Sequence, residues 1–192
     1  MPPSEPTTDH LWPAEVGDIL LHIARAAIAA ELDLSATPPT TAQWLDRVGA
    51  TFVTLYAHGR LRGCIGTIIA HRPIAEDIRI NACNAAFRDP RFEPVTPQEY
   101  PDLRLEVSQL SSPEPLTCTS EDELINRLRP GIDGVLLTAG EHRGTFLPQV
   151  WKQLPRKADF VTELKTKAGV ADQPWDPTWQ VSRYTITAWS ET

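Results

Sequence analysis

Leu61-Arg-Gly-Cys-Ile-Gly66 is the stretch that decides the fold, and it follows Thr51-Phe-Val-Thr-Leu-Tyr-Ala57 after a short His58-Gly-Arg60 link. The two outer runs consist largely of β-branched, aliphatic and aromatic residues, which favour extended strands. Gly59 can adopt the unusual backbone angle that a tight turn between antiparallel strands requires. The sequence therefore predicts a β-hairpin over residues 51–69, with its turn at residues 58–60.

The segments on either side of this hairpin give helix and strand signals. Residues 15–32 carry apolar side chains at helical spacing, and this helix is expected to lie on a sheet. Pro73 is suited to the first position of a helix that runs to about Arg88, because the missing N–H of proline costs nothing there. Apolar and charged residues alternate from Leu103 to Val107, as they do in a half-buried strand.

The second half of the chain also contains both helix and strand signals. Residues 120–123 form a capping box that opens a helix, and residues 157–168 predict another helix with one apolar stripe. A second hairpin is predicted over residues 135–147, and a closing strand over residues 181–189. Because at least two connections are hairpins, the pattern favours an α+β fold with a mainly antiparallel sheet over a doubly wound parallel sheet.

Composition limits the classes of protein that fit. A chain of 192 residues with 41% hydrophobic residues can form one domain or two intimate lobes, and the Pro- and Thr-rich residues 1–14 predict a flexible tail. The formal charge of -7 argues against non-specific binding of nucleic acid. No apolar run approaches the ~20 residues that a membrane span needs. Three cysteines, an odd number without CxxC spacing, suggest neither a disulfide framework nor a zinc site. A protein without disulfides is expected in the cytoplasm.

The cysteine inside the second strand is the main candidate for chemistry. Strand alternation divides this segment into two faces, with Leu61, Gly63 and Ile65 on one and Arg62, Cys64 and Gly66 on the other. Glycine within a strand often marks the close approach of a ligand or of another backbone. Arg62 lies about 7 Å from Cys64 along the strand and can favour a thiolate there.

A purely structural interpretation competes with this one. Cys64 can be a small buried hydrophobe, and the two glycines can permit a bulge or tight packing of a helix. Cys83 is expected in the core, Cys118 has no predicted role, and His58 can serve as a base only if the hairpin brings it to Cys64. Otherwise His58 is a solvated turn residue.

Two further groups of charged residues have alternative interpretations. Glu106 lies on the polar side of its strand and provides a carboxylate facing Cys64 if the two strands are neighbours; otherwise it is a solvent-facing position. Arg88, Asp89 and Arg91 form a charged cluster that either binds an anion or makes internal salt bridges that fix a loop. The sequence lacks a Gly-rich phosphate loop, a dinucleotide fingerprint, HExxH and GxSxG, so we predict no metal and no cofactor.

The segment Gly59-Arg-Leu-Arg-Gly-Cys-Ile-Gly-Thr67 resembles the signature of the AMMECR domain family, also called AmmeMemoRadiSam system protein A. Further blocks resemble the family in the same order: residues 86–92, 105–108, 131–134, 144–151 and 164–169. The resemblance spans residues 15–189 as a single AMMECR domain and leaves residues 190–192 as a tail. It implies a two-lobed α+β fold, with a larger lobe of sheet and helices and a smaller, mostly helical lobe.

The same resemblance implies a functional context. The proposed functional segment of the family corresponds to Leu61, Arg62, Gly63, Cys64, Ile65 and Gly66. The implied partners are a Memo-type protein, similar to extradiol dioxygenases, and a radical SAM protein.

Three hypotheses follow for the function. In the first, the protein is an enzyme or enzyme subunit that uses Cys64, activated by Arg62, as a nucleophile or covalent carrier in a small-molecule or nucleobase modification pathway. Alternatively it is an adaptor that docks onto those partners through the hairpin. The third hypothesis is a regulatory module that binds an anionic ligand at Arg62, Arg88 and Arg91.

Overall fold

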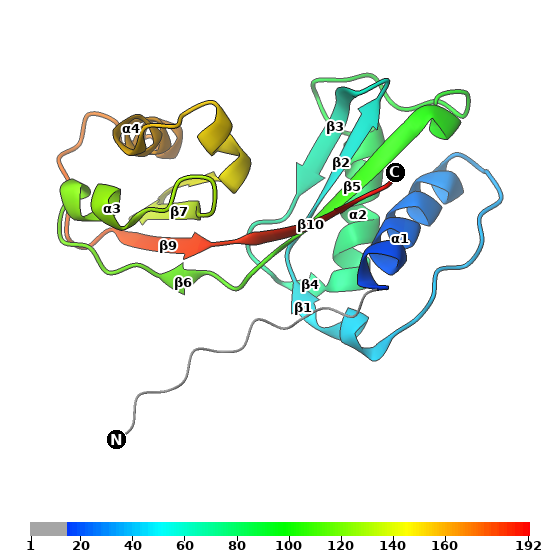
Figure 1. The fold of residues 1–192 in the computed structure, drawn as a ribbon, viewed down its shortest axis with the longest axis horizontal. Helices are drawn as coiled ribbons and strands as arrows, with labels where there is room; N and C mark the ends of the chain where they lie inside the picture. The colour runs from blue at the N-terminus through cyan, green and yellow to red at the C-terminus, as the bar shows by residue number, and fades with distance from the viewer. Residues whose placement is uncertain (1–14) are drawn as a thin grey trace.

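Ten strands and four α-helices form two lobes in the computed structural model, which describes residues 15–192 (Figure 1). The tail predicted over residues 1–14 lies outside the described residues. The two lobes lie side by side, and the segments over residues 103–115 and 180–190 run from one lobe into the other (Figure 1). The expected α+β fold with antiparallel sheets is confirmed.

The first lobe contains a four-stranded antiparallel sheet in the order β10-β5-β2-β3. Its strands are β2 (Thr51–Ala57), β3 (Arg60–Gly66), β5 (Leu103–Leu110) and β10 (Ile186–Ser190). The helices α1 (Val16–Glu31) and α2 (Ile74–Phe87) pack against one face of this sheet, and a two-stranded sheet of β1 (Val48–Gly49) and β4 (Arg72–Pro73) lies beside α2. The core between helices and sheet includes Leu20, Ile28, Val53, Leu55 and Leu105. Because the helices cover one face only, the other face is left to the second lobe and to solvent.

The second lobe has a four-stranded sheet of its own in the order β6-β9-β7-β8. Its strands are β6 (Glu114–Pro115), β7 (Gly134–Ala139), β8 (His142–Phe146) and β9 (Gln180–Tyr184). Its helices are α3 (Glu121–Arg127) and α4 (Lys157–Ala168), with a 3-10 turn over Pro148–Lys152. The Trp151 and Phe160 rings stack in its core with their centroids 3.7 Å apart. This lobe was expected to be mostly helical, and it contains a sheet beside its helices.

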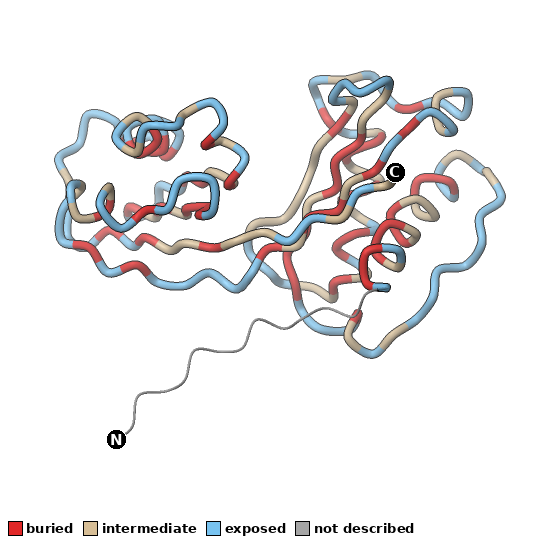
Figure 2. The backbone as a smooth tube through the Cα atoms, in the orientation of Figure 1, coloured by how far each residue is buried: buried red, intermediate tan, exposed pale blue. Residues whose placement is uncertain are grey.

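Extended chain segments join the two lobes, and the strands on either side of each junction belong to different sheets. The closing strand predicted over residues 181–189 is two strands, because Thr185 separates β9 in the second sheet from β10 in the first. A small apolar cluster at the junction contains Tyr184, Leu110 and Ala50, with Phe52 and Leu136 packed against it. Figure 2 shows short buried stretches, separated by intermediate and exposed ones, where the strands pass between the lobes. The lobes therefore share packed residues as well as a linking chain.

Local chemistry explains where several elements begin and end. The positive φ predicted for Gly59 is present at 74°, and His58 also has a positive φ, 51°, so both residues of the turn have the sign that a type I′ hairpin requires. Strand β3 ends at Gly66 and not at Ile69. Ser120 accepts the Glu123 N–H as the predicted N-cap of α3.

The C-terminal residues belong to the folded part. Ser190 ends β10, although residues 190–192 were expected to form a tail. Glu191 makes an ion pair with Arg25 at 2.6 Å and accepts the backbone N–H of Leu105 at 3.0 Å. No helix among residues 15–192 has both the length and the apolar character needed to cross a membrane.

Candidate functional site around Cys64

The two glycines that bracket Cys64 are explained by packing on opposite faces of β3. A Cβ atom at Gly63 would collide with the backbone oxygen of Ala85, so the glycine lets α2 approach the strand directly. A Cβ atom at Gly66 would collide with the ring of Phe52 on the neighbouring strand. Close approach of another backbone and of an aromatic ring, without a ligand, accounts for both glycines.

A β-bulge changes the faces that simple alternation predicts. Leu55 pairs with Gly63, while the next residue of β2, Tyr56, pairs with Leu61, so Arg62 is the extra residue of β3. Paired residues share a face, and Leu61 therefore lies on the Tyr56 side of the sheet with Cys64, not on the face of Gly63 and Ile65 as predicted. Leu61 is 42% exposed there.

Cys64 belongs to a row of side chains on the sheet face that the helices leave uncovered. Thr54 pairs directly with Cys64 on one side and with Glu106 on the other, and its hydroxyl donates to Cys64 Sγ at 3.3 Å. Ser190 donates to the Glu106 carboxylate at 3.0 Å. Cys64 and Glu106 thus share a face, but β2 lies between their strands, which puts their backbones about 10 Å apart.

Tyr56 completes this face. It lies two residues along β2 from Thr54 and therefore projects to the same side. Burial raises the pKa of the Tyr56 hydroxyl, and the neighbouring Glu106 and Cys64 raise it further. The phenol is therefore protonated at neutral pH beside the cysteine.

A carboxylate and a guanidinium from outside the sheet hold the backbone of Cys64. The Cys64 N–H donates to Asp89 at 2.9 Å, and Arg91 donates to the Cys64 carbonyl at 3.2 Å. Asp89 and Arg91 also pair with each other at 2.6 Å, and Asp89 is buried. The Arg91 guanidinium, together with the Cys64 N–H, holds the pKa of the Asp89 carboxyl well below its usual range. Because β3 is an edge strand, this clamp satisfies backbone groups that would otherwise be free.

The arginines predicted for an anion site are all paired with carboxylates. Arg62 contacts Glu99 at 3.1 Å and lies over the Phe92 ring, with one buried guanidinium nitrogen unpartnered among residues 15–192. The Arg62 guanidinium also holds the pKa of Glu99 below its usual range. Arg91 pairs with Asp89, and the exposed Arg88 pairs with Glu31 at 3.4 Å. This pattern matches the alternative in which the charged cluster makes internal salt bridges.

The remaining predicted residues lie elsewhere. His58 is exposed in the hairpin turn. Cys118 is buried and donates to the Leu116 carbonyl, and burial raises the pKa of its thiol.

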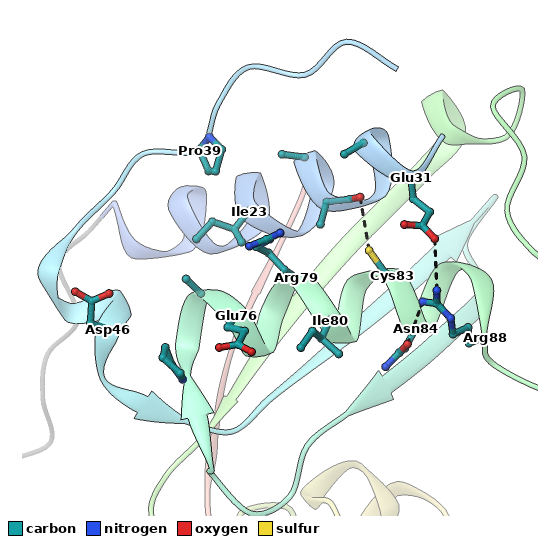
Figure 3. A pocket seen from close by; sticks show the side chains of 15 residues that line it. Ile23, Glu31, Pro39, Asp46, Glu76, Arg79, Ile80, Cys83, Asn84 and Arg88 are labelled. Carbon is teal, nitrogen blue, oxygen red and sulfur yellow. Dashed lines mark hydrogen bonds and ion pairs between the residues drawn. The ribbon is translucent and has the colours of Figure 1, made fainter. Parts of the chain in front are cut away.

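Cys83 is half-buried, whereas it was predicted to lie in the core. It lines a groove of about 950 Å³ between α1 and α2, where its thiol points to the Ala27 carbonyl at 3.6 Å (Figure 3). The ion pair of Glu31 and Arg88 lies at one end of this groove (Figure 3). Burial raises the pKa of the Cys83 thiol, and the nearby Glu31 carboxylate adds to the effect.

Sequence reasoning missed a buried polar network at the far end of the hairpin. Asp77 is fully buried and accepts hydrogen bonds from Thr51, Thr67, Arg72 and Asn81 at 2.6–3.0 Å. The signal in the sequence was an acid and an amide four residues apart on an otherwise apolar helix face. The network ties α2 to β2 and to the segment that follows β3. Within residues 15–192, no group of three or more His, Cys, Asp or Glu side chains is placed to hold a metal ion.

Comparison with known proteins fits this geometry. The sequence profile of AMMECR1 matches residues 21–189, which include the hairpin, both sheets and all but the start of α1. The chain belongs to the AMMECR1 family. A relative from Methanothermobacter thermautotrophicus is 37% identical over 173 residues, covering 88% of this chain and 90% of the relative. A relative from Thermotoga maritima is 41% identical over 146 residues, covering 73% and 76%.

A solved structure has the same fold. The crystal structure of the uncharacterized protein PH0010 from Pyrococcus horikoshii matches with a TM-score of 0.77 and 30% identity, covering 91% of each chain. The names of these AMMECR1 relatives state no activity, and PH0010 is itself uncharacterized. The functional argument therefore depends on the residues of the site.

Proposed function

We propose that this AMMECR1-family protein is a cytoplasmic enzyme or enzyme subunit that uses the Cys64 thiol as a nucleophile or covalent carrier on a small molecule or nucleobase. The observation that carries the proposal is the hydrogen bond from Thr54 to Cys64 Sγ, made on the sheet face opposite α1 and α2. A hydroxyl that donates to sulfur stabilises negative charge on it. A thiolate is the nucleophilic form of cysteine.

The rigid backbone of Cys64 supports the same role. Asp89 and Arg91 fix its N–H and carbonyl, and Gly63 anchors the next peptide against α2. A nucleophile held in one position loses little entropy when it reacts. Arg62, which was expected to activate the thiol, pairs with Glu99, so in this proposal it positions the bulge and does not contact the sulfur.

The proposed step is a substitution at an electrophilic carbon. The sulfur forms a bond to that carbon, and the bond from the carbon to its leaving group breaks with the electron pair going to the leaving group. The thiol proton passes to the leaving group through the Thr54 hydroxyl or the protonated Tyr56 phenol. A second nucleophile then forms a bond to the same carbon, the carbon–sulfur bond breaks with its electron pair returning to Cys64, and the proton lost by that nucleophile restores the thiol.

Limiting alkylation with peptide mapping tests this proposal. Iodoacetamide is added at less than one equivalent to wild-type protein and to the Cys64→Ser, Cys83→Ser and Cys118→Ser variants. We expect most of the label on Cys64, because Cys118 is buried and the Cys83 thiol has a raised pKa. Preferential labelling of Cys83, or equal labelling of all three thiols, would contradict the proposal.

A second candidate is an adaptor that docks onto a Memo-type or radical SAM protein through the hairpin face. It is favoured by Leu61, a large apolar side chain that is 42% exposed on the same face as Cys64. The test is co-migration of the purified proteins at micromolar concentration, with Leu61→Asp as the disrupting variant. Ile132→Asp is the matched control, because Ile132 is 51% exposed on the second lobe. Failure to co-migrate, or equal loss in both variants, removes this candidate.

A further inference from the structure

A second concave site lies between the lobes, at the end of the hairpin opposite its turn. It is a groove of about 480 Å³, lined from the first lobe by Thr67, Ile68, Ile69 and His71, and from the second by Leu136, Arg143, Gly144, Thr145 and Lys167. Grooves between domains are common positions for small-molecule sites. None of the roles considered for Cys64 uses these residues.

The second lobe presents one face of its sheet to this groove. A Cβ atom at Gly144 would contact Ala168 of α4, so Gly144 faces that helix and its neighbours Arg143 and Thr145 face the other way. Leu136 pairs with Thr145 and shares its face. Because β8 is an edge strand, Lys167 of α4 can reach the groove beside it.

The first lobe supplies a fixed, apolar wall. Thr67 donates to Asp77 at 2.7 Å and accepts from Arg72 at 3.0 Å, so the segment that follows β3 is anchored at both ends. Between these anchors Ile69 is 44% exposed, which is unusual for a large aliphatic side chain. An apolar surface that is held in place beside a groove suits the apolar part of a ligand.

The charges in the groove all have one sign. Its lining contains Arg143 and Lys167 and no Asp or Glu, in a chain of net charge -7. Neither Arg143 nor Lys167 forms an ion pair within residues 15–192, although ten such pairs are present in that range. The Lys167 ammonium instead lies 5.0 Å from the centre of the Phe146 ring. Two unneutralised cations at the rim of an apolar groove are complementary to an anion.

We propose that the groove between the lobes binds a small organic anion, in which a carboxylate or phosphate contacts Arg143 and Lys167 and an apolar body lies on Ile69 and Leu136. The guanidinium of Arg143 can bind either headgroup through two parallel hydrogen bonds. This inference goes beyond the proposed function and does not require Cys64 to be reactive.

Titration of the full-length protein with simple probes, followed by amide NMR shifts, tests the proposal. Benzoate and phenyl phosphate carry both parts of the proposed ligand and differ in headgroup. Acetate and inorganic phosphate carry only the charge, and benzyl alcohol carries only the apolar body. We expect saturable shifts at Ile68, Ile69, Leu136 and Thr145 with benzoate or phenyl phosphate, and the tighter of the two identifies the headgroup.

The variants Arg143→Ala and Lys167→Ala remove one cation each from exposed positions. Each is expected to weaken binding about tenfold, whereas the exposed Lys152→Ala, on the same lobe, serves as the matched control and should leave it unchanged. Cys64→Ser should bind as wild type does, which separates this test from that of the thiol. The proposal is overturned if neither aromatic anion gives saturable shifts in the groove, if benzyl alcohol or inorganic phosphate binds as tightly, or if Lys152→Ala loses as much affinity as Arg143→Ala.

Discussion

The hydroxyl of Thr54 donates a hydrogen bond to the sulfur of Cys64 at 3.3 Å, across a pair of directly opposed residues on β2 and β3. Thr54→Val preserves the shape of the side chain and removes the donor. A hydrogen bond of about 1 kcal/mol corresponds to roughly fivefold slower alkylation of Cys64 at neutral pH. Thr54→Ser keeps a hydroxyl and should restore most of the rate, and equal rates in the valine and serine variants would show that the donor has no effect.

The clamp on the edge of β3 should make stability depend on pH through Asp89. Asp89→Asn is expected to lower the free energy of unfolding by about 2 kcal/mol at pH 7, because it weakens charge-assisted hydrogen bonds to a buried group. The folded-state pKa of Asp89 is depressed, so its stabilisation is present above about pH 3.9 and is lost as the pH falls below that value.

Urea unfolding of wild-type and Asp89→Asn protein at neutral and acidic pH measures this difference. The gap between the two should shrink on acidification. Arg88→Ala is the control, because its exposed pair with Glu31 should change stability by less than about 0.5 kcal/mol. A gap that stays constant with pH would mean that the Asp89 carboxylate is not the stabilising group.

The two glycines beside Cys64 should respond differently to substitution. Gly63→Ala places a methyl group against the Ala85 carbonyl oxygen, which belongs to the helix backbone, and should cost about 3 kcal/mol. Ala85→Gly should not rescue it, since the carbonyl remains. Gly66→Ala collides with Cγ and both Cδ atoms of Phe52, so adding Phe52→Ala, which removes all three atoms, should recover part of its loss. Thermal or urea unfolding of this set would contradict the packing account if Gly63→Ala were neutral.

The hydroxyl of Tyr184, at the junction of the lobes, should lose its proton at a higher pH than an exposed tyrosine. Burial raises the pKa of its hydroxyl to about 12, and the hydroxyl bonds to Thr145 at 2.9 Å and to the Phe146 carbonyl at 3.1 Å. The folded state holds this proton more tightly than the unfolded state, so the stabilisation is present below about pH 10 and declines above it. In an ultraviolet absorbance titration, the Tyr184→Phe variant should lack the tyrosine ionisation that occurs at the highest pH in the wild type. If the variant instead lacks an ionisation near pH 10, the Tyr184 hydroxyl is not buried as described.

Features that depend on local chemistry were predictable from the sequence. Gly59 in the hairpin turn and Ser120 as the N-cap of α3 each act through neighbouring residues only. The family blocks also predicted a two-lobed arrangement. Such signals place elements, but they do not order strands within a sheet.

Features that depend on how the strands pair could not be predicted from the sequence. The bulge at Arg62 arises from the register between β2 and β3, and it moves Leu61 to the face of Cys64. The interposition of β2 between Cys64 and Glu106 is likewise a matter of strand order. The charged cluster after α2 was recognised, but only the structure shows that Asp89 and Arg91 hold the backbone of Cys64.

The rate of alkylation of Cys64 at neutral pH tests the central claim most directly, and a Cys83→Ser, Cys118→Ser double variant leaves Cys64 as the single thiol. The account predicts that iodoacetamide modifies Cys64 several-fold faster in the folded protein than in the same variant unfolded in urea, where the Thr54 hydroxyl no longer donates to the sulfur. A folded protein that reacts no faster than the unfolded one would contradict the account and make Cys64 a packing residue.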